Sequence, residues 1–249
     1  MKIRTALLAA AACAAAAHAG TVHTFDDPAE LADFTKDRYT PAVFEIAHFD
    51  GDSRLRHGVR AADNEANRGG TSYSSNFYNY QGMKHGADST IRSVAIDLFV
   101  DSTWAVGTRA GFWTTMSNGN LSYPIIEYVV GGEVDGDSNY TGFRWWQSEI
   151  GWTAASASYG LDAWSTLEIH LVGDTVHFIV NGDTIGTVDA RHADSIDNII
   201  LNVHNQGAAG DYDVYWDNLT FSVTAVPVPH AAGLGLLGLS TLAARRRRA

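Results

Sequence analysis

Six residues whose types suit carbohydrate binding recur at alternating positions in three neighbouring stretches of the chain. The stretches 108–116, 123–130 and 140–150 alternate like β-strands, in which residues two apart share a face. One face would carry mainly apolar side chains and form the core. The opposite face would carry two arginines, a carboxylate and three aromatic rings: Arg109, Trp113, Tyr123, Glu127, Arg144 and Trp146.

This mixture of rings and charges has two interpretations. Aromatic rings stack on the apolar faces of sugars, while arginine and carboxylate groups hydrogen-bond sugar hydroxyls, so the six residues would form a polysaccharide-binding face. Alternatively, Arg109, Glu127 and Arg144 form a cross-strand ion network that binds no ligand. A shift of the strand register by one residue would exchange the two faces.

Glycoside hydrolysis would require a second carboxyl group close to Glu127. A retaining glycosidase holds its two carboxyl groups about 5 Å apart. Glu149 is nearby in the sequence, but alternation from Arg144 and Trp146 places it on the opposite face. We therefore expect a non-catalytic polysaccharide-binding protein. A glycoside hydrolase or lyase that uses Glu127 is the alternative, and a structural surface protein without a ligand is another.

The elements that would position these residues are strands, which we expect throughout residues 20–225. Short turns rich in Gly, Asn and Asp separate most of them, and Asn181-Gly182 is typical of a two-residue hairpin. Asn118-Gly119 indicates a second hairpin, and residues 28–37 allow one short helix. The predicted strands are 92–100, 108–116, 123–130, 140–150, 166–172, 175–180, 184–188, 196–203 and 212–223. This pattern predicts an all-β fold, a two-sheet antiparallel jelly-roll sandwich in a single domain.

Two stretches resemble concanavalin A-like and laminin G-like jelly rolls. Residues 164–182 open on a tryptophan and contain the turn Val180-Asn181-Gly182, like the central hairpin of those proteins, and residues 212–221 resemble their last strand, which pairs with the first. The resemblance implies glycan binding on a concave sheet face. Residues 123–130 also resemble the nucleophile strand of family eleven xylanases, whereas the Glu-x-Asp-x-x-Glu strand of family sixteen glucanases is absent from the sequence.

The charge of the expected domain is strongly negative. Without Lys2, Arg4 and the four arginines 245–248, 11 of the 17 Lys and Arg residues remain against 28 Asp and Glu, a formal charge of −17. This charge disfavours a polyanionic partner, including nucleic acid, and suits cations or neutral polysaccharide.

Two sets of acidic residues suggest binding sites for calcium, which is the possible cofactor of this chain. Glu133, Asp135 and Asp137 crowd one loop, but they lack the bidentate acid that completes an EF-hand, so we expect a solvated hairpin tip. Asp26 near the first strand and Asp217 in the last would meet if those strands pair. They are therefore our candidate ligands for a structural calcium ion.

Residues 1–19 have the features of a secretory signal peptide. Lys2 and Arg4 precede the apolar run 6–17, and Ala17-His18-Ala19 offers the small residues that signal peptidase requires. The only cysteine, Cys13, lies within this segment, so the exported chain would hold no disulfide.

Residues 226–249 combine a proline motif, an apolar stretch and an arginine cluster. The uncharged stretch 231–244 is shorter than the roughly 18–20 residues that comfortably span a bilayer, and the arginines would remain on the cytoplasmic side. These features predict a stop-transfer segment. The motif residues are Val226, Pro227, Val228 and Pro229, and the cluster is Arg245, Arg246, Arg247 and Arg248.

This tail resembles the PEP-CTERM sorting signal of Gram-negative bacteria, in a form similar to the VPLPA variant with His230 in place of alanine. The resemblance implies transient anchoring in the inner membrane through an apolar helix, cleavage by an exosortase, and delivery to the cell surface or exopolysaccharide matrix. The expected partners are thus signal peptidase, exosortase, the membrane and a polysaccharide.

Overall fold

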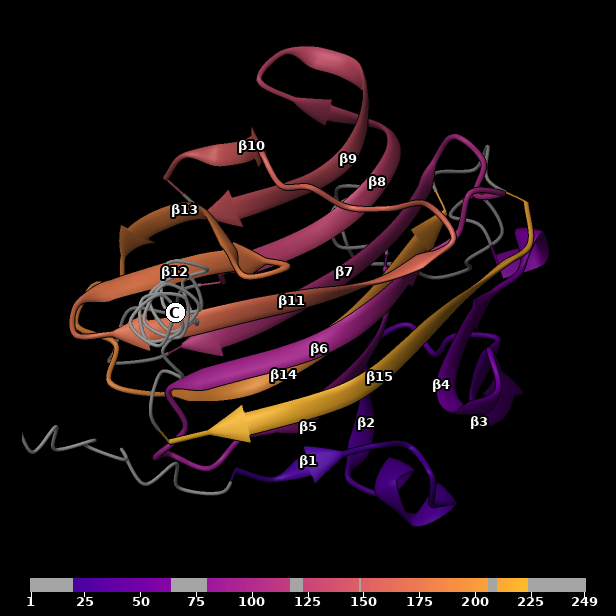
Figure 1. Ribbon diagram of the computed structural model, residues 1–249, viewed down its shortest axis with the longest axis horizontal. Coiled ribbons are helices and arrows are strands. Elements are labelled where there is room, and N and C mark those ends of the chain that lie inside the picture. Colours follow the sequence, from indigo (N-terminus) through magenta and orange to yellow (C-terminus); the bar gives the residue numbers. More distant parts are fainter. Residues whose placement is uncertain (1–19, 64–79, 117–122, 148, 206–209, 224–249) are drawn as a thin grey trace, which may run out of the picture.

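The computed structural model describes residues 20–63, 80–116, 123–147, 149–205 and 210–223. These residues form two antiparallel β-sheets packed face to face (Figure 1). The predicted all-β, jelly-roll-like sandwich is confirmed. The expected signal peptide, the tail 226–249 and the hairpin at Asn118-Gly119 lie outside the described residues. Among the helices that the structure describes, none is long and apolar enough to cross a membrane.

Sheet A has eight strands in the order β13-β12-β11-β6-β15-β4-β3, with β1 also paired to β15. Its strands are β1 (Val22–His23), β3 (Val43–Phe49), β4 (Asp52–Val59), β6 (Ser93–Val100), β11 (Ala163–Val172), β12 (Thr175–Val180), β13 (Asp183–Asp189) and β15 (Tyr212–Ser222). The expected pairing of the first strand with the last is therefore present.

Sheet B has seven strands in the order β10-β9-β8-β7-β14-β5-β2. Its strands are β2 (Phe34–Arg38), β5 (Gln81–Gly86), β7 (Thr108–Met116), β8 (Ile125–Val134), β9 (Asp137–Gln147), β10 (Gly151–Ala154) and β14 (Ile196–Asn205). The three strands expected to carry the candidate site, β7, β8 and β9, are consecutive neighbours in this sheet.

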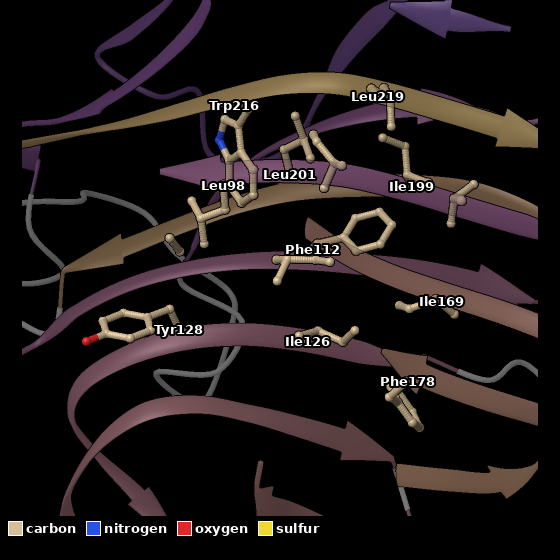
Figure 2. Packing of buried hydrophobic residues seen from close by; sticks show 14 of the residues in the cluster. Leu98, Phe112, Ile126, Tyr128, Ile169, Phe178, Ile199, Leu201, Trp216 and Leu219 are labelled. Atoms are coloured by element: carbon tan, nitrogen blue, oxygen red, sulfur yellow. The ribbon is translucent and has the colours of Figure 1, made fainter. Parts of the chain in front are cut away.

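The core lies between the sheets and follows the alternation of the strands. Figure 2 shows side chains from both sheets in this interior, among them Phe112 and Ile126 of sheet B and Leu98 and Ile169 of sheet A. All four are completely buried. Burial of a side chain of this kind stabilises the fold by roughly 1.5–3 kcal/mol. Because alternate residues of a strand point to opposite faces, burial of the apolar set also fixes which residues lie on the outer face.

The helix expected over residues 28–37 is shorter than predicted. A 3-10 helix, η1, covers Pro28–Leu31, and a second one, η2, covers Ala61–Asp63. Asp27 and Glu30 form a capping box that begins η1. The helix stops because Phe34 is buried in the core and opens β2, where it pairs with His85 of β5. The hairpin at Asn181-Gly182 is confirmed, since both residues have positive φ, 51° and 83°.

Candidate functional site

The strand register of sheet B aligns one row of polar residues on its outer face. Asn202 of β14 lies opposite Gly111 of β7, Gly111 opposite Glu127 of β8, and Glu127 opposite Arg144 of β9. The residues that alternate with them, such as Phe112 and Ile126, belong to the core, so this row faces away from it.

The structure brings most of the predicted site residues together on this outer face. Arg109 and Trp113 flank the row on β7, and Trp146 flanks it on β9. Tyr123 lies just before β8 and is half-buried. The predicted strand register therefore places the residues correctly. Their exposure differs from the expectation, however, because Glu127 is only 1% exposed and Arg144 is fully buried.

Glu127 and Arg144 form a buried ion pair. Arg144 Nε donates to Glu127 Oε1 at 2.8 Å, and a second guanidinium nitrogen contacts the same oxygen. The third guanidinium nitrogen donates to the backbone carbonyl of Glu133. The Trp152 ring covers the guanidinium, with its centroid 3.9 Å from Arg144 Cζ. All of the pairing falls on Oε1, and no described residue donates a hydrogen bond to Oε2 of Glu127.

A small cavity, here called the central cavity, adjoins this pair. Its volume is about 10 Å³, which is room for about one water molecule. Glu127 is the only carboxylate among its described lining residues. These are Tyr80, Arg109, Trp113, Glu127, Trp152, Asn202 and His204.

Two polar groups at the central cavity have unused hydrogen-bonding capacity. Asn202 Oδ1 and Arg109 Nε are buried and have no hydrogen-bond partner among the described residues. Burial lowers the pKa of Arg109, although the charge of Glu127 opposes this effect. Gly111 makes room for the amide, since a Cβ there would lie 2.6 Å from Asn202 Nδ2. Buried groups of this kind favour a polar occupant.

Aromatic rings form an apolar cluster beside the polar row. The Trp113 and Tyr80 rings lie 4.4 Å apart, and the Trp146 and Trp152 rings 5.3 Å apart, centroid to centroid. The Tyr80 hydroxyl donates to Asp37 Oδ2 at 2.5 Å. Burial, reinforced by this hydrogen bond, raises the pKa of Tyr80, so the phenol remains a neutral donor.

Four residues of the central cavity were missed by the sequence analysis. Asn202 and His204 alternate along β14, so the same two-residue period could have placed them on the outer face. Trp152 belongs to β10, a four-residue strand too short to give a pattern, and Tyr80 lies one residue before the unpredicted β5. Neither ring carries a sequence signal that points to this site.

Glu149 is not among the described residues that line the central cavity. It lies in the turn between β9 and β10 rather than on the opposite face of a strand, and its exposed carboxylate forms an ion pair with Arg191. The acidic loop at 133–137 is the β8–β9 hairpin tip, with positive φ at Asp135 and Gly136. The expectation of a solvated turn is met.

The proposed calcium ligands do not form a recognisable metal centre. Asp217 is buried and pairs with Arg54 at 3.0 Å, while Asp26 accepts a hydrogen bond from Thr24. Among the described residues, no group of three or more His, Cys, Asp or Glu side chains could hold a metal ion. The sorting motif, residues 226–229 and 245–248, lies outside the described part of the chain.

Comparison with known proteins identifies the fold through structure alone. No protein-family profile matches the sequence, and no curated protein matches it either. A Bacteroides ovatus family 16 glycoside hydrolase, solved with a mixed-linkage glucan product, matches 81% of this chain and 99% of its own, with a TM-score of 0.55 and 12% identity.

Two other solved structures show the same likeness. The Crh5 transglycosylase in complex with NAG matches 85% of this chain and 86% of its own, with a TM-score of 0.53 and 10% identity. SCLam, a non-specific endo-β-1,3(4)-glucanase of family 16, matches 81% of this chain and 89% of its own, with a TM-score of 0.53 and 14% identity.

The expected main function, non-catalytic polysaccharide binding on an open sheet face, is wrong. The three solved structures described above each match more than four-fifths of the chain, and they are two family 16 enzymes and a transglycosylase. In addition, the charged groups of the expected face are buried rather than displayed. The chain thus has an all-β, jelly-roll-like sandwich fold similar to that of these solved structures.

Proposed function

We propose that the protein acts on a polysaccharide as a glycoside hydrolase or transglycosylase, with Glu127 as its nucleophilic carboxylate. The structural neighbours that act on β-glucans favour a β-glucan as the substrate class. The observation that carries the proposal is the asymmetry of the Glu127 carboxylate. Arg144 holds Oε1, whereas Oε2 accepts no hydrogen bond from a described residue at the central cavity.

This asymmetry suits nucleophilic catalysis. An arginine partner fixes the orientation of a carboxylate through charge-assisted hydrogen bonds. Oε2 would attack the anomeric carbon and form a glycosyl ester, while the glycosidic bond breaks and the leaving oxygen takes a proton. Water would then attack the ester in hydrolysis, and a sugar hydroxyl would attack it in transglycosylation.

The proton donor is the part of this mechanism that differs from the two-carboxylate scheme. No second carboxylate is found among the described residues that line the central cavity. Imidazole transfers protons near neutral pH, and His204 is the described cavity residue of that type. We therefore propose His204 as the first group to test for the acid and base role.

Entry of a sugar requires Trp152 to move. The central cavity holds about one water molecule, far less than a hexose needs. Trp152 is half-buried and belongs to β10, a strand of four residues that, among the described strands, lies at the edge of sheet B and pairs with β9 alone. Such a short edge strand separates more readily than a central one. The rings of Trp152, Trp113 and Tyr80 would then stack on the sugar.

The test is a matched pair of carboxylate variants. Purified wild-type protein, Glu127→Gln and Glu149→Gln are incubated with mixed-linkage β-glucan, laminarin and xylan, and the products are separated by chromatography. We expect turnover by the wild type and by Glu149→Gln, and a loss of at least about 10³-fold in Glu127→Gln. Absence of products from every polysaccharide, or full activity of Glu127→Gln, would contradict the proposal.

A covalent probe tests the role of Glu127 more directly. A 2-deoxy-2-fluoro glycoside slows breakdown of the glycosyl ester, so the intact protein should gain the mass of one glycosyl group. Peptide mapping should place the adduct on the peptide that contains Glu127. Labelling of the Glu127→Gln variant to the same extent would exclude Glu127 as the nucleophile.

We also propose that the protein is exported and sorted to the cell surface or its matrix. The support comes from the signal-like residues 1–19 and from the proline motif and arginine cluster of residues 226–249. Mass spectrometry of surface material should find the mature chain beginning at Gly20 and ending near Pro229. Replacement of Arg245–Arg248 by alanine should retain a longer form, and an unaltered C-terminus in that variant would refute the sorting proposal.

A further inference from the structure

A second, larger cavity lies at the rim of the sandwich, away from Glu127. It lies where the connection from β6 to β7 meets the start of β15 and the end of β3. Its volume is about 360 Å³, within the range of small-ligand sites. We call it the rim cavity. The lining residues that matter here are Phe49, Asp101, Trp104, Thr108, Asp211 and Tyr215.

Two carboxylates of the rim cavity each have one oxygen that accepts no hydrogen bond from a described residue. Asp101 accepts hydrogen bonds from the backbone and hydroxyl of Thr103 at Oδ1 alone. Asp211 accepts one from the backbone nitrogen of Ala61, also at Oδ1 alone. No described residue donates a hydrogen bond to Oδ2 of either aspartate.

The neighbouring Asp213 is already neutralised. Its carboxylate pairs with Arg56 at 2.7 Å through one oxygen and with Arg60 at 2.9 Å through the other. The unpaired charge of the cavity therefore belongs to Asp101 and Asp211, and it is negative.

The buried hydroxyl of Thr108, a residue that lines this cavity, also lacks a hydrogen-bond partner among the described residues. Thr108 is only 1% exposed. An unsatisfied buried hydroxyl is costly, so its presence indicates a polar occupant. This observation is independent of the carboxylates.

Aromatic rings form the rest of the wall. The Phe49 and Tyr215 rings stack with their centroids 3.7 Å apart at an interplanar angle of 7°. Trp104 is held by a hydrogen bond from its Nε1 to the carbonyl of Asp213 at 3.2 Å. Burial raises the pKa of Tyr215, and the carboxylates of Asp213 and Asp101 raise it further, which places these charges next to the ring.

We propose that the rim cavity binds an organic ammonium ion of the size of an amino sugar. Carboxylates and aromatic faces together favour such cations, and a threonine hydroxyl accepts a hydrogen bond from an ammonium group. A bare metal ion is disfavoured because no metal-binding group of three side chains occurs among the described residues. The negative charge of the protein would attract the same class of ligand.

This proposal does not rest on the proposed glycosidase function. None of the residues that line the rim cavity also lines the central cavity, and binding can be measured without turnover. Failure of one proposal therefore leaves the other intact.

Three sugars that share one ring test the proposal. D-glucosamine at pH 6 carries the ammonium group, N-acetyl-D-glucosamine carries an uncharged amide, and D-glucose carries a hydroxyl. Binding is followed by the NMR shifts of the Trp104 indole and the Thr108 amide in the purified protein. We expect D-glucosamine to bind with a Kd of about 1–10 mM and the two neutral sugars at least about tenfold more weakly.

Matched variants locate the site. Asp211→Asn and Asp101→Asn remove one charge each, and Thr108→Val removes the hydroxyl at nearly constant volume. Each should weaken D-glucosamine binding several-fold, whereas Asp174→Asn, an exposed aspartate lining another cavity, should not. Equal binding of the three sugars, no shift with D-glucosamine, or unchanged affinity in both aspartate variants would overturn the proposal.

Discussion

The central cavity and the rim cavity use the same kinds of side chain with opposite charge. At the central cavity two arginines face one carboxylate, and the ion pair is covered by Trp152. At the rim cavity two aspartates keep an oxygen each, and the volume is about 360 Å³ against about 10 Å³. The first site is filled by its own side chains, whereas the second has room for a ligand.

The difference follows from where each site lies on the strands. In the middle of a sheet, neighbouring strands present side chains directly opposite each other, so Glu127 and Arg144 meet and form an ion pair through Glu127 Oε1. The rim cavity is lined mainly by connections and strand ends, where Asp101 and Asp211 accept hydrogen bonds from backbone nitrogens and, at Asp101, from the Thr103 hydroxyl. In a closed site such as the central cavity, a covering side chain must move before a ligand can enter.

Removal of Arg144 should have the largest effect on stability and separate the two sites most clearly. Arg144→Met leaves the Glu127 carboxylate buried without its cation, which costs about 3–5 kcal/mol. Arg60→Met at the rim breaks a partly exposed pair with Asp213, which costs about 0–1 kcal/mol. Urea denaturation measures both free energies of unfolding.

The double variant Arg144→Met with Glu127→Gln serves as the control. It removes both charges, so it should recover most of the stability lost in Arg144→Met. Similar losses in Arg144→Met and Arg60→Met would show that the two sites do not differ in the way their burial indicates.

Acid should destabilise the interior of the sandwich. His57 of β4 is fully buried beside the Phe44 ring, and burial lowers its pKa to about 3. Below pH 6.5 the unfolded chain binds a proton at His57 that the folded protein does not take up until about pH 3. Stability contributed by neutral His57 is therefore present above pH 6.5 and is lost as the pH falls, by up to about 1.4 kcal/mol per pH unit.

The variant His57→Leu isolates this contribution. It should flatten the dependence of the free energy of unfolding on pH between 6.5 and 3, as measured by urea denaturation at several pH values. An unchanged slope in that window would mean that His57 does not remain neutral in the folded protein.

Strand alternation correctly predicts those strands that have one apolar face toward the core and one polar outer face. The bounds of β7 and β12 agree with the sequence to the residue, and the face of Arg109, Glu127 and Arg144 is correct. The strands β2 to β5 were missed because charged residues, histidine and glycine interrupt their pattern. In β5, Gly82 is required by the Tyr80 ring, since a Cβ would lie 2.6 Å from it.

Burial of the candidate site could not be predicted in the same way. Alternation assigns a side chain to a face, but it does not say what covers that face. Here the cover includes Trp152 from the unpredicted β10 and Tyr80, which lies next to the unpredicted β5. Alternation also gives no information on cavities formed by connections, so the rim cavity had no sequence signal.

Tyr212 links the two sites, and its hydroxyl should have a smaller effect on stability. The ring lines the rim cavity, while the hydroxyl accepts from the backbone nitrogen of His204 at 2.8 Å and lies 3.0 Å from the carbonyl oxygen of Arg109. Tyr212→Phe leaves that buried backbone donor unsatisfied, which costs about 1–3 kcal/mol. Hydrogen exchange should accelerate at His204 and leave Gly82 unchanged. Acceleration at both positions alike would indicate general loosening instead.

A matched pair of glycines provides the last comparison of the two sites. At Gly111 a Cβ would lie 2.6 Å from Asn202 Nδ2 and 3.1 Å from Glu127 Cβ, whereas at Gly210 it would meet nothing within 4 Å. Either alanine stabilises by restricting the unfolded chain, by about 0.4–1 kcal/mol, so this contribution cancels in their difference. Gly111→Ala should be less stable than Gly210→Ala by about 1–3 kcal/mol, the cost of overpacking.

The difference in urea midpoint between the two alanine variants therefore reports how tightly each site is packed. Equal midpoints would mean that the Asn202 amide moves aside freely, so that the central cavity is as adaptable as the rim cavity. A clear deficit in Gly111→Ala would mean that the polar row is rigid, and that a substrate reaches Glu127 by displacing Trp152 rather than by parting the row.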